Sequence, residues 1–105
     1  MSKQTVFDKV NALEGLCSGS CQFLWDNPEV GGTEEKSANY MRNLLKEAGF
    51  TIVNEEKLPH AFYAEFGSGH PVIAILGEYD ALPILSQEAG CPEQRPVCEG
   101  APGHG

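Results

Sequence analysis

Residues 72–83 read Val72-Ile73-Ala74-Ile75-Leu76-Gly77-Glu78-Tyr79-Asp80-Ala81-Leu82-Pro83, and the expected fold depends on them more than on any other segment. The unbroken apolar run at the start is typical of a strand that is buried on both faces of a sheet. The run ends at Gly77, and acidic residues follow directly. In open α/β sheets, ligands bind beyond the carboxyl ends of the strands. The segment therefore predicts a core strand that delivers the carboxylate of Asp80 to a functional loop.

Helical spacing dominates the residues that lie upstream of this strand. Apolar residues recur at helical intervals from Val6 to Trp25, which predicts one long helix that ends at Asn27-Pro28. A second helix is expected to begin at a Thr33 N-cap and to end before Gly49, a ready left-handed C-terminal residue.

Two short strands are expected between the second helix and residues 72–76. Residues 50–53 form the first, and residues 61–66 alternate in polarity as a half-buried strand does. The turn that follows is short, which predicts a hairpin between 61–66 and 72–76. Beyond Gly77 a helical turn at Leu85–Glu88 is expected within a long loop. The fold class is therefore α/β, with two helices, a partial mixed sheet and a long loop.

The composition narrows the class of protein. The chain has 105 residues, which fits one small domain, and it carries 15 acidic against 7 basic residues for a net charge of −8. This balance argues against nucleic-acid binding, which relies on Lys and Arg patches. No apolar run approaches the ~20 residues of a membrane-spanning helix, and residues 1–5 lack the pattern of a signal peptide. We therefore expect no membrane partner and a cytoplasmic location.

The four cysteines fall into two pairs. Cys17 and Cys21 lie four residues apart on the first expected helix, and we expect them to be small buried hydrophobic residues. Cys91 and Cys98 lie in a Pro-rich loop, where a structural or incidental role is expected. A redox or metal-binding role of the cysteines stays open as an alternative.

Asp80, Glu78 and the histidines are the candidates for chemistry. A carboxylate at Asp80 can bind a cation, hold a metal-ligating His or orient a general base, and Glu78 is a possible second carboxylate. Alternatively, Asp80 caps the following turn and Glu78 faces solvent. His60 and His70 are expected to be solvated, whereas His104 lies between two glycines that let a metal or substrate approach.

Residues 77–91, with the Glu-Tyr-Asp-Ala-Leu-Pro segment at 78–83, and the Pro-Gly-His-Gly segment at 102–105 carry a family resemblance. They resemble the amidohydrolase branch of the dinuclear metallopeptidases, a superfamily that includes aminoacylases and carboxypeptidases. The nearest members are of the aminobenzoyl-glutamate utilisation type and the N-acyl-amino-acid amidohydrolases. The resemblance implies that residues 1–105 are an incomplete N-terminal part of a zinc-peptidase-like three-layer α/β/α catalytic domain.

The resemblance also implies the chemistry. Asp80 matches an acidic position that bridges or orients the metal ligands, and Glu78 stands where related peptidases have a ligating His. His104 matches the first His of a Gly-His-Gly-Cys-Gly-His run, whose Cys and second His are the ligands. Asp80 is thus the expected catalytic and metal-supporting residue, with His104 as a second metal candidate.

The implied activity belongs to a longer protein. That protein would use a divalent metal, two Zn or Mn ions, to hydrolyse the amide bond of N-acyl or aminobenzoyl amino acids, and it would form a homo-oligomer. The chain by itself is expected to be inactive. The alternative is a small acidic interaction module without catalysis, which binds a partner chain through an exposed apolar edge.

Overall fold

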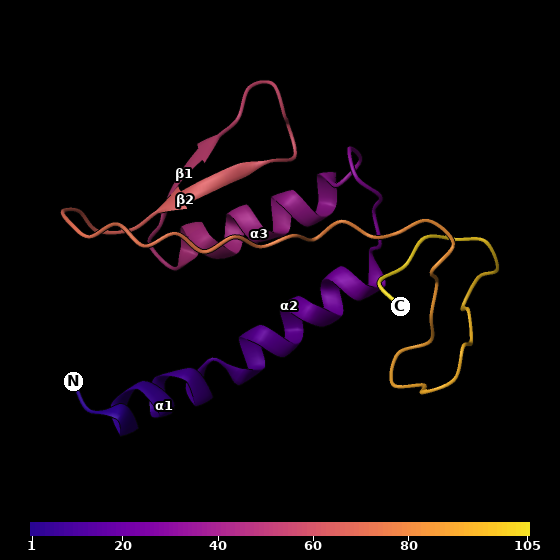
Figure 1. Cartoon of the computed structure of the whole chain (residues 1–105), viewed down its shortest axis with the longest axis horizontal. Coiled ribbons are helices and arrows are strands. Elements are labelled where there is room, and N and C mark those ends of the chain that lie inside the picture. The colour runs from indigo at the N-terminus through magenta and orange to yellow at the C-terminus, as the bar shows by residue number, and fades with distance from the viewer.

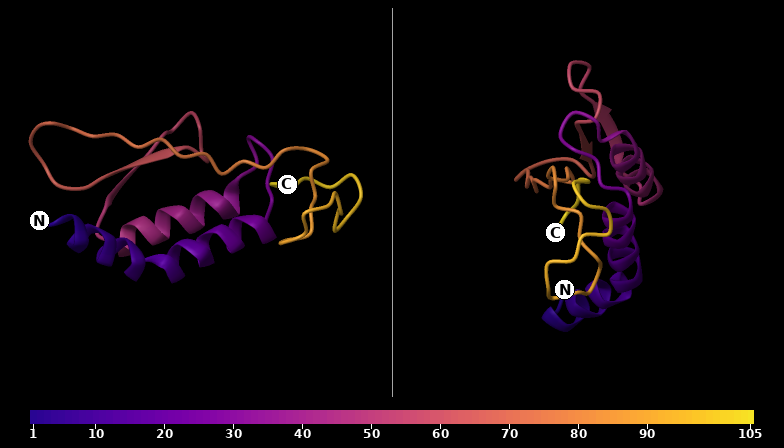
Figure 2. Two further views of the ribbon diagram at one scale, coloured as in Figure 1. Left: turned by 60° about the horizontal axis from the view of Figure 1, so that its bottom comes forward. Right: turned by 90° about the vertical axis from the view of Figure 1, so that its right-hand side faces the viewer.

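The computed structural model describes residues 1–105 as three helices and two strands. Figure 1 shows the elements in chain order: α1 (Lys3–Ala12), α2 (Glu14–Asp26), α3 (Glu35–Glu47), β1 (Thr51–Asn54) and β2 (Phe62–Glu65). The α1 and α2 helices form an arm that extends away from α3 and the sheet, and the C-terminal loop lies near the end of α2 (Figures 1 and 2). None of the helices has the length and apolar character needed to cross a membrane.

The first helical region is divided, so the prediction of one long helix is wrong in this respect. Leu13 has φ −94° and ψ 0°, which separates α1 from α2. The end at Asn27 is confirmed, and the Asn27 side chain caps α2 by donating to the Phe23 carbonyl at 2.9 Å. Residues 1–19 of this arm are exposed, and Cys17 and Cys21 are exposed rather than buried as expected.

α3 is the centre around which the other elements pack. It contacts both β1 and β2, and its Ala38 is completely buried. On another side, the Tyr40 ring stacks on Phe23 of α2 with centroids 4.0 Å apart, and its hydroxyl lies 3.3 Å from Ser20 Oγ. The expected C-terminal Gly49 has φ +92°, the left-handed conformation that glycine adopts without strain. This helix was predicted correctly apart from its N-cap.

The sheet pairs the two predicted short strands with each other. β1 and β2 are antiparallel, with Thr51 opposite Glu65 and Asn54 opposite Phe62. The alternation expected for residues 61–66 is confirmed over 62–65, since Phe62 and Ala64 are half-buried while Tyr63 and Glu65 are exposed, but Phe66 lies outside the strand and is exposed. The sheet has two strands only, and the three-layer α/β/α arrangement stays a prediction.

Residues 72–76 are the main correction to the expected fold. They are extended but belong to no strand, and Val72, Ile73, Ile75 and Leu76 are 78%, 83%, 94% and 90% exposed. The expected hairpin with residues 61–66 is wrong, because β2 bonds to β1 on one edge and to nothing on the other. The helical turn expected at Leu85–Glu88 is also absent.

Candidate active site

Asp80 is held in place through its two neighbours in the chain. The Ala81 amide donates to the Glu29 carbonyl at 2.7 Å, and the Ala81 side chain is buried. On the other side, the Tyr79 hydroxyl donates to the His60 carbonyl. The backbone around Asp80 is therefore fixed, while its own side chain is exposed and accepts no hydrogen bond from the protein.

Residues 82–86, which follow Asp80, form backbone hydrogen bonds with the C-terminal segment. Leu82 and Gly103 exchange two backbone hydrogen bonds of 3.0 Å each, and the Ser86 amide donates to the Ala101 carbonyl at 3.0 Å. These bonds place the Pro-Gly-His-Gly segment beside residues 82–86, so the two segments that carry the family resemblance are neighbours in space.

An open cavity of about 350 Å³ lies at Asp80. Three carboxylates line it, those of Glu34, Glu78 and Asp80. His60 and Tyr79 also contribute to its wall. His60 was expected to be solvated and is instead half-buried here, whereas His70 is exposed as predicted. The cavity thus collects acidic groups, with a neutral phenol and an imidazole beside them.

Tyr79 is a site residue whose role the sequence reasoning missed. Burial raises the pKa of its phenol above 10.0; the Arg42 guanidinium opposes this shift, and the carboxylates of Glu34 and Glu29 add to it. Tyr79 therefore stays protonated and remains a hydrogen-bond donor to the His60 carbonyl at neutral pH. Arg42 reinforces the same wall, because it donates to the Pro59 carbonyl at 2.6 Å and lies over the Phe62 ring.

Glu29 is the second residue that was missed, and it replaces Thr33 as the cap of α3. Its carboxylate accepts from the Lys36 amide at 3.0 Å and from both the amide and the hydroxyl of Ser37 at 2.7 Å. Thr33 instead donates its hydroxyl to the Val30 carbonyl at 2.8 Å. Glu29 therefore makes two kinds of contact. Its side chain caps α3, and its backbone carbonyl accepts a hydrogen bond from the Ala81 amide and so holds the backbone beside Asp80.

The pKa of Glu29 has two opposing influences. Burial raises it, but the hydrogen bonds from Ser37 and the backbone amides, together with the charge of Lys36, outweigh burial and lower it below the ordinary 4.5. A lowered pKa means that the ionised carboxylate stabilises the folded state above pH 4.5, and that this stabilisation is lost as the pH falls through the folded-state pKa.

Removal of the Glu29 cap is expected to loosen the start of α3. Glu29→Ala should lower the stability of the first turn by about 0.5–2 kcal/mol, because the Lys36 and Ser37 amides lose their acceptor. Amide hydrogen exchange at these two residues measures the effect. Glu35→Ala, which changes an exposed carboxylate of the same turn without a side-chain partner, is the matched control and should leave that protection nearly unchanged.

The same carboxylate predicts a pH effect. Protection of the Ser37 amide should decrease as the pH falls below 4.5 in the unmodified chain, because protonation weakens Glu29 as an acceptor. In Glu29→Gln that decrease should be absent. An equal pH dependence in both chains would contradict the assignment of Glu29 as the cap.

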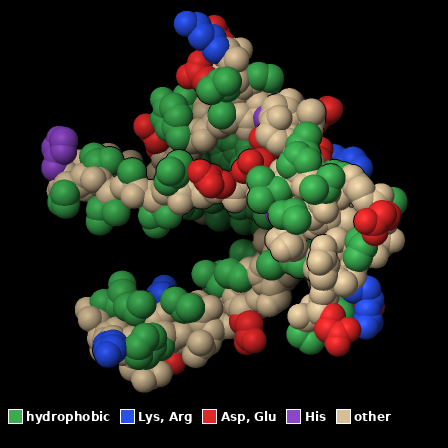
Figure 3. All heavy atoms as spheres, turned by 45° about the vertical axis from the view of Figure 1, so that its right-hand side comes forward, with side chains coloured by type: hydrophobic (Ala, Val, Ile, Leu, Met, Phe, Trp, Pro, Cys, Tyr) green, Lys and Arg blue, Asp and Glu red, His purple; other side chains and the backbone are tan.

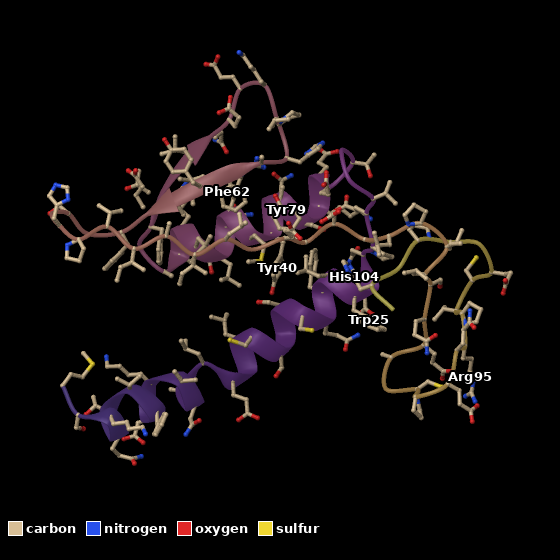
Figure 4. All side chains as sticks on the ribbon, viewed as in Figure 1. Trp25, Tyr40, Phe62, Tyr79, Arg95 and His104 are labelled. Atoms are coloured by element: carbon tan, nitrogen blue, oxygen red, sulfur yellow. The ribbon has the colours of Figure 1, made fainter.

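His104 lies at a different cavity from Asp80. It lines a recess at the end of α2 together with Trp25, Gln87 and Cys91, and Figure 4 shows His104 next to Trp25. Its Nε2 is buried and has no hydrogen-bond partner. The structure therefore holds the two predicted site residues on neighbouring segments without directing them into one cavity.

The chain does not by itself fit a complete metal centre. No three His, Cys, Asp or Glu side chains come together in a way that could hold a metal ion. All four cysteines are free, and Cys91 lines a cavity together with His104. Asp80 and His104 stay predicted site residues, and no chemical step through a metal follows from the residues present.

Among known proteins, the chain matches a hydrolase subunit in sequence. No family model matches the chain, and no solved structure matches it. The chain is 51% identical over 83 residues to a p-aminobenzoyl-glutamate hydrolase subunit of Escherichia coli (strain K12). The matched stretch makes up 78% of this chain and 17% of that protein, so the chain spans about a sixth of the length of the curated relative. This match confirms the resemblance predicted from the sequence: over these 83 residues the chain is a relative of the p-aminobenzoyl-glutamate hydrolase type.

Proposed function

We propose that the chain forms part of the catalytic domain of a metal-dependent amidohydrolase that cleaves p-aminobenzoyl-glutamate or a related N-acyl amino acid. The observation that carries the proposal is the 51% identity over 83 residues to a protein named as a hydrolase subunit. At that identity the two chains share a fold over the matched stretch, and the chemistry of the relative is the first candidate. A location in the cytoplasm remains a prediction.

Within this proposal, Asp80 serves as a supporting carboxylate. Its backbone is fixed by Ala81 and Tyr79, while its oxygens stay free to accept hydrogen bonds from a metal ligand or to meet a cation. Such preorganisation is what a supporting group requires, because a site loses activity when its ligands are loosely oriented. The divalent metal, Zn or Mn, would act as the Lewis acid of the hydrolysis, and its remaining ligands would come from outside this chain.

The isolated chain is expected to be inactive. With p-aminobenzoyl-glutamate and added Zn²⁺ or Mn²⁺, it should release no p-aminobenzoate above the rate of the metal alone, because no three potential ligands come together in it. The Escherichia coli hydrolase is the positive control. Release of p-aminobenzoate that increases with chain concentration and disappears in Asp80→Asn would contradict this expectation.

The second candidate is an interaction module, and one observation favours it. Four large apolar side chains of residues 72–76 are more than three-quarters exposed, which is a property of surfaces that bind a partner. The two candidates differ in a simple respect: a module binds its partner without any dependence on Asp80, whereas the hydrolase depends on Asp80.

A further inference from the structure

Asp80 lies among other carboxylates, so its position depends on how firmly its backbone is held. A Cβ atom at Gly31 would lie 3.8 Å from Asp80 Oδ2 and 4.0 Å from Glu34 Oε1, so both carboxylates approach the same glycine. Glu78 lines the same open cavity, and Figure 3 shows acidic side chains gathered where the extended segment that includes residues 71–77 joins the rest of the molecule. Like charges repel one another, so the anchors of Asp80 must come from outside this cluster.

The anchors on the two sides of Asp80 both lead to α3. On the C-terminal side, Ala81 donates its amide to the carbonyl of Glu29, whose carboxylate caps α3. On the N-terminal side, the Tyr79 hydroxyl donates to the His60 carbonyl, which lies in the loop between β1 and β2. The second anchor is therefore only as firm as the hold on that loop.

Arg42 of α3 holds the same loop. Its Nη2 donates to the Pro59 carbonyl at 2.6 Å, directly before the carbonyl that accepts from Tyr79. Its guanidinium also lies 5.1 Å from the centroid of the Phe62 ring, within the range of a cation–π contact. Two consecutive carbonyls of the loop are thus fixed, one by a donor from α3 and the other by Tyr79.

We propose that Tyr79 and Arg42 are positioning residues of the hydrolysis and that they act on it through the orientation of Asp80. This inference rests on the proposed function, since it assigns both residues a part in that reaction. Arg42 does not line the cavity at Asp80, and the single O–H of Tyr79 is already donated to the His60 carbonyl. A supporting carboxylate loses efficiency when it is loosely oriented, so loss of either donor lowers turnover without weakening substrate binding.

Amide hydrogen exchange in the chain itself tests the positioning. Tyr79→Phe removes only the hydroxyl and should accelerate exchange of the Ala81 amide by about fivefold, because one of the two anchors beside Asp80 is lost. Tyr63→Phe makes the same chemical change at an exposed tyrosine of β2 and is the matched control, which should leave this exchange unchanged. Unchanged exchange at Ala81 in Tyr79→Phe would overturn the proposal.

Kinetics in a hybrid hydrolase test the part played in the reaction. The hybrid carries this chain in place of the matched part of the Escherichia coli hydrolase subunit. Tyr79→Phe and Arg42→Met should each lower kcat for p-aminobenzoyl-glutamate by about fivefold and leave KM within about twofold, as expected for groups that support the transition state without binding substrate. Tyr63→Phe should change neither constant.

The Asp80→Asn hybrid separates positioning from a general effect on structure. If both residues act through the Asp80 carboxylate, neither Tyr79→Phe nor Arg42→Met should lower kcat by more than about twofold in this background, because the group that they orient is already changed. A decrease by the same factor in both backgrounds would overturn the proposal. An unmodified hybrid without hydrolysis would overturn the proposed function and this role with it, whereas an active hybrid unaffected by Tyr79→Phe or by Arg42→Met would overturn only the positioning role.

Discussion

Replacement of Gly103 by alanine is expected to detach the C-terminal segment from residues 82–86. A Cβ atom at this position would lie 2.6 Å from the Leu85 carbonyl carbon and 2.7 Å from Ser86 Cα, and it would overlap the Leu85 carbonyl oxygen. These are backbone atoms, so no side-chain rotation relieves the overlap. The two segments of this contact must separate, and both hydrogen bonds between Leu82 and Gly103 are lost.

Amide hydrogen exchange at Leu82 reports this change directly. Loss of a hydrogen bond worth about 1 kcal/mol, together with the overlap, should accelerate exchange by at least about tenfold in Gly103→Ala. Gly77→Ala is the matched control, because nothing lies within 4 Å of a Cβ at that position and its φ is outside the left-handed region. Unchanged protection of Leu82 in Gly103→Ala would show that the segments are not in contact.

Loss of the Asp80 charge is expected to lower the hydrolytic activity strongly. In a hybrid hydrolase that carries this chain, Asp80→Asn should lower the hydrolysis of p-aminobenzoyl-glutamate by about 10- to 100-fold, the range found when a group that orients metal ligands is changed. Asparagine preserves the shape of the side chain, and the anchors of Ala81 and Tyr79 do not involve the carboxylate. The loss should therefore appear in activity rather than in folding.

Glu78→Gln is the control for the same variant. Glu78 lines the same cavity and carries the same charge, but its backbone lacks the hydrogen bond that fixes Ala81, so it is less rigidly held. We expect a smaller decrease for Glu78→Gln than for Asp80→Asn. Equal activity of Asp80→Asn and the unmodified hybrid would remove Asp80 from the proposed site.

The sequence was most informative where local forces decide the structure. α3, β1 and β2 follow their hydrophobic periodicity, and Gly49 ends α3 as a left-handed glycine is expected to do. The resemblance based on residues 78–83 and 102–105 also agrees with the match to a hydrolase subunit.

The predictions that were wrong concern contacts between residues that lie far apart in the sequence. An apolar run indicates strand propensity, but it does not supply the neighbour to which a strand bonds, and residues 72–76 find none in this chain. Helical spacing likewise places Cys17 and Cys21 on one face without showing whether anything packs there. The Glu29 cap acts on Ser37 across a loop, beyond the three-residue range of the usual capping signals.

If this chain supplies a working part of an aminobenzoyl-glutamate-type amidohydrolase, it should replace the corresponding part of its relative. The experiment exchanges the matched stretch of the Escherichia coli hydrolase subunit for the 83 residues of this chain and measures p-aminobenzoate release. We expect the hybrid to hydrolyse p-aminobenzoyl-glutamate within about tenfold of the unmodified enzyme, a difference of ~1.4 kcal/mol in transition-state stabilisation. A hybrid that folds and assembles normally but shows no metal-dependent hydrolysis would disprove the proposed function.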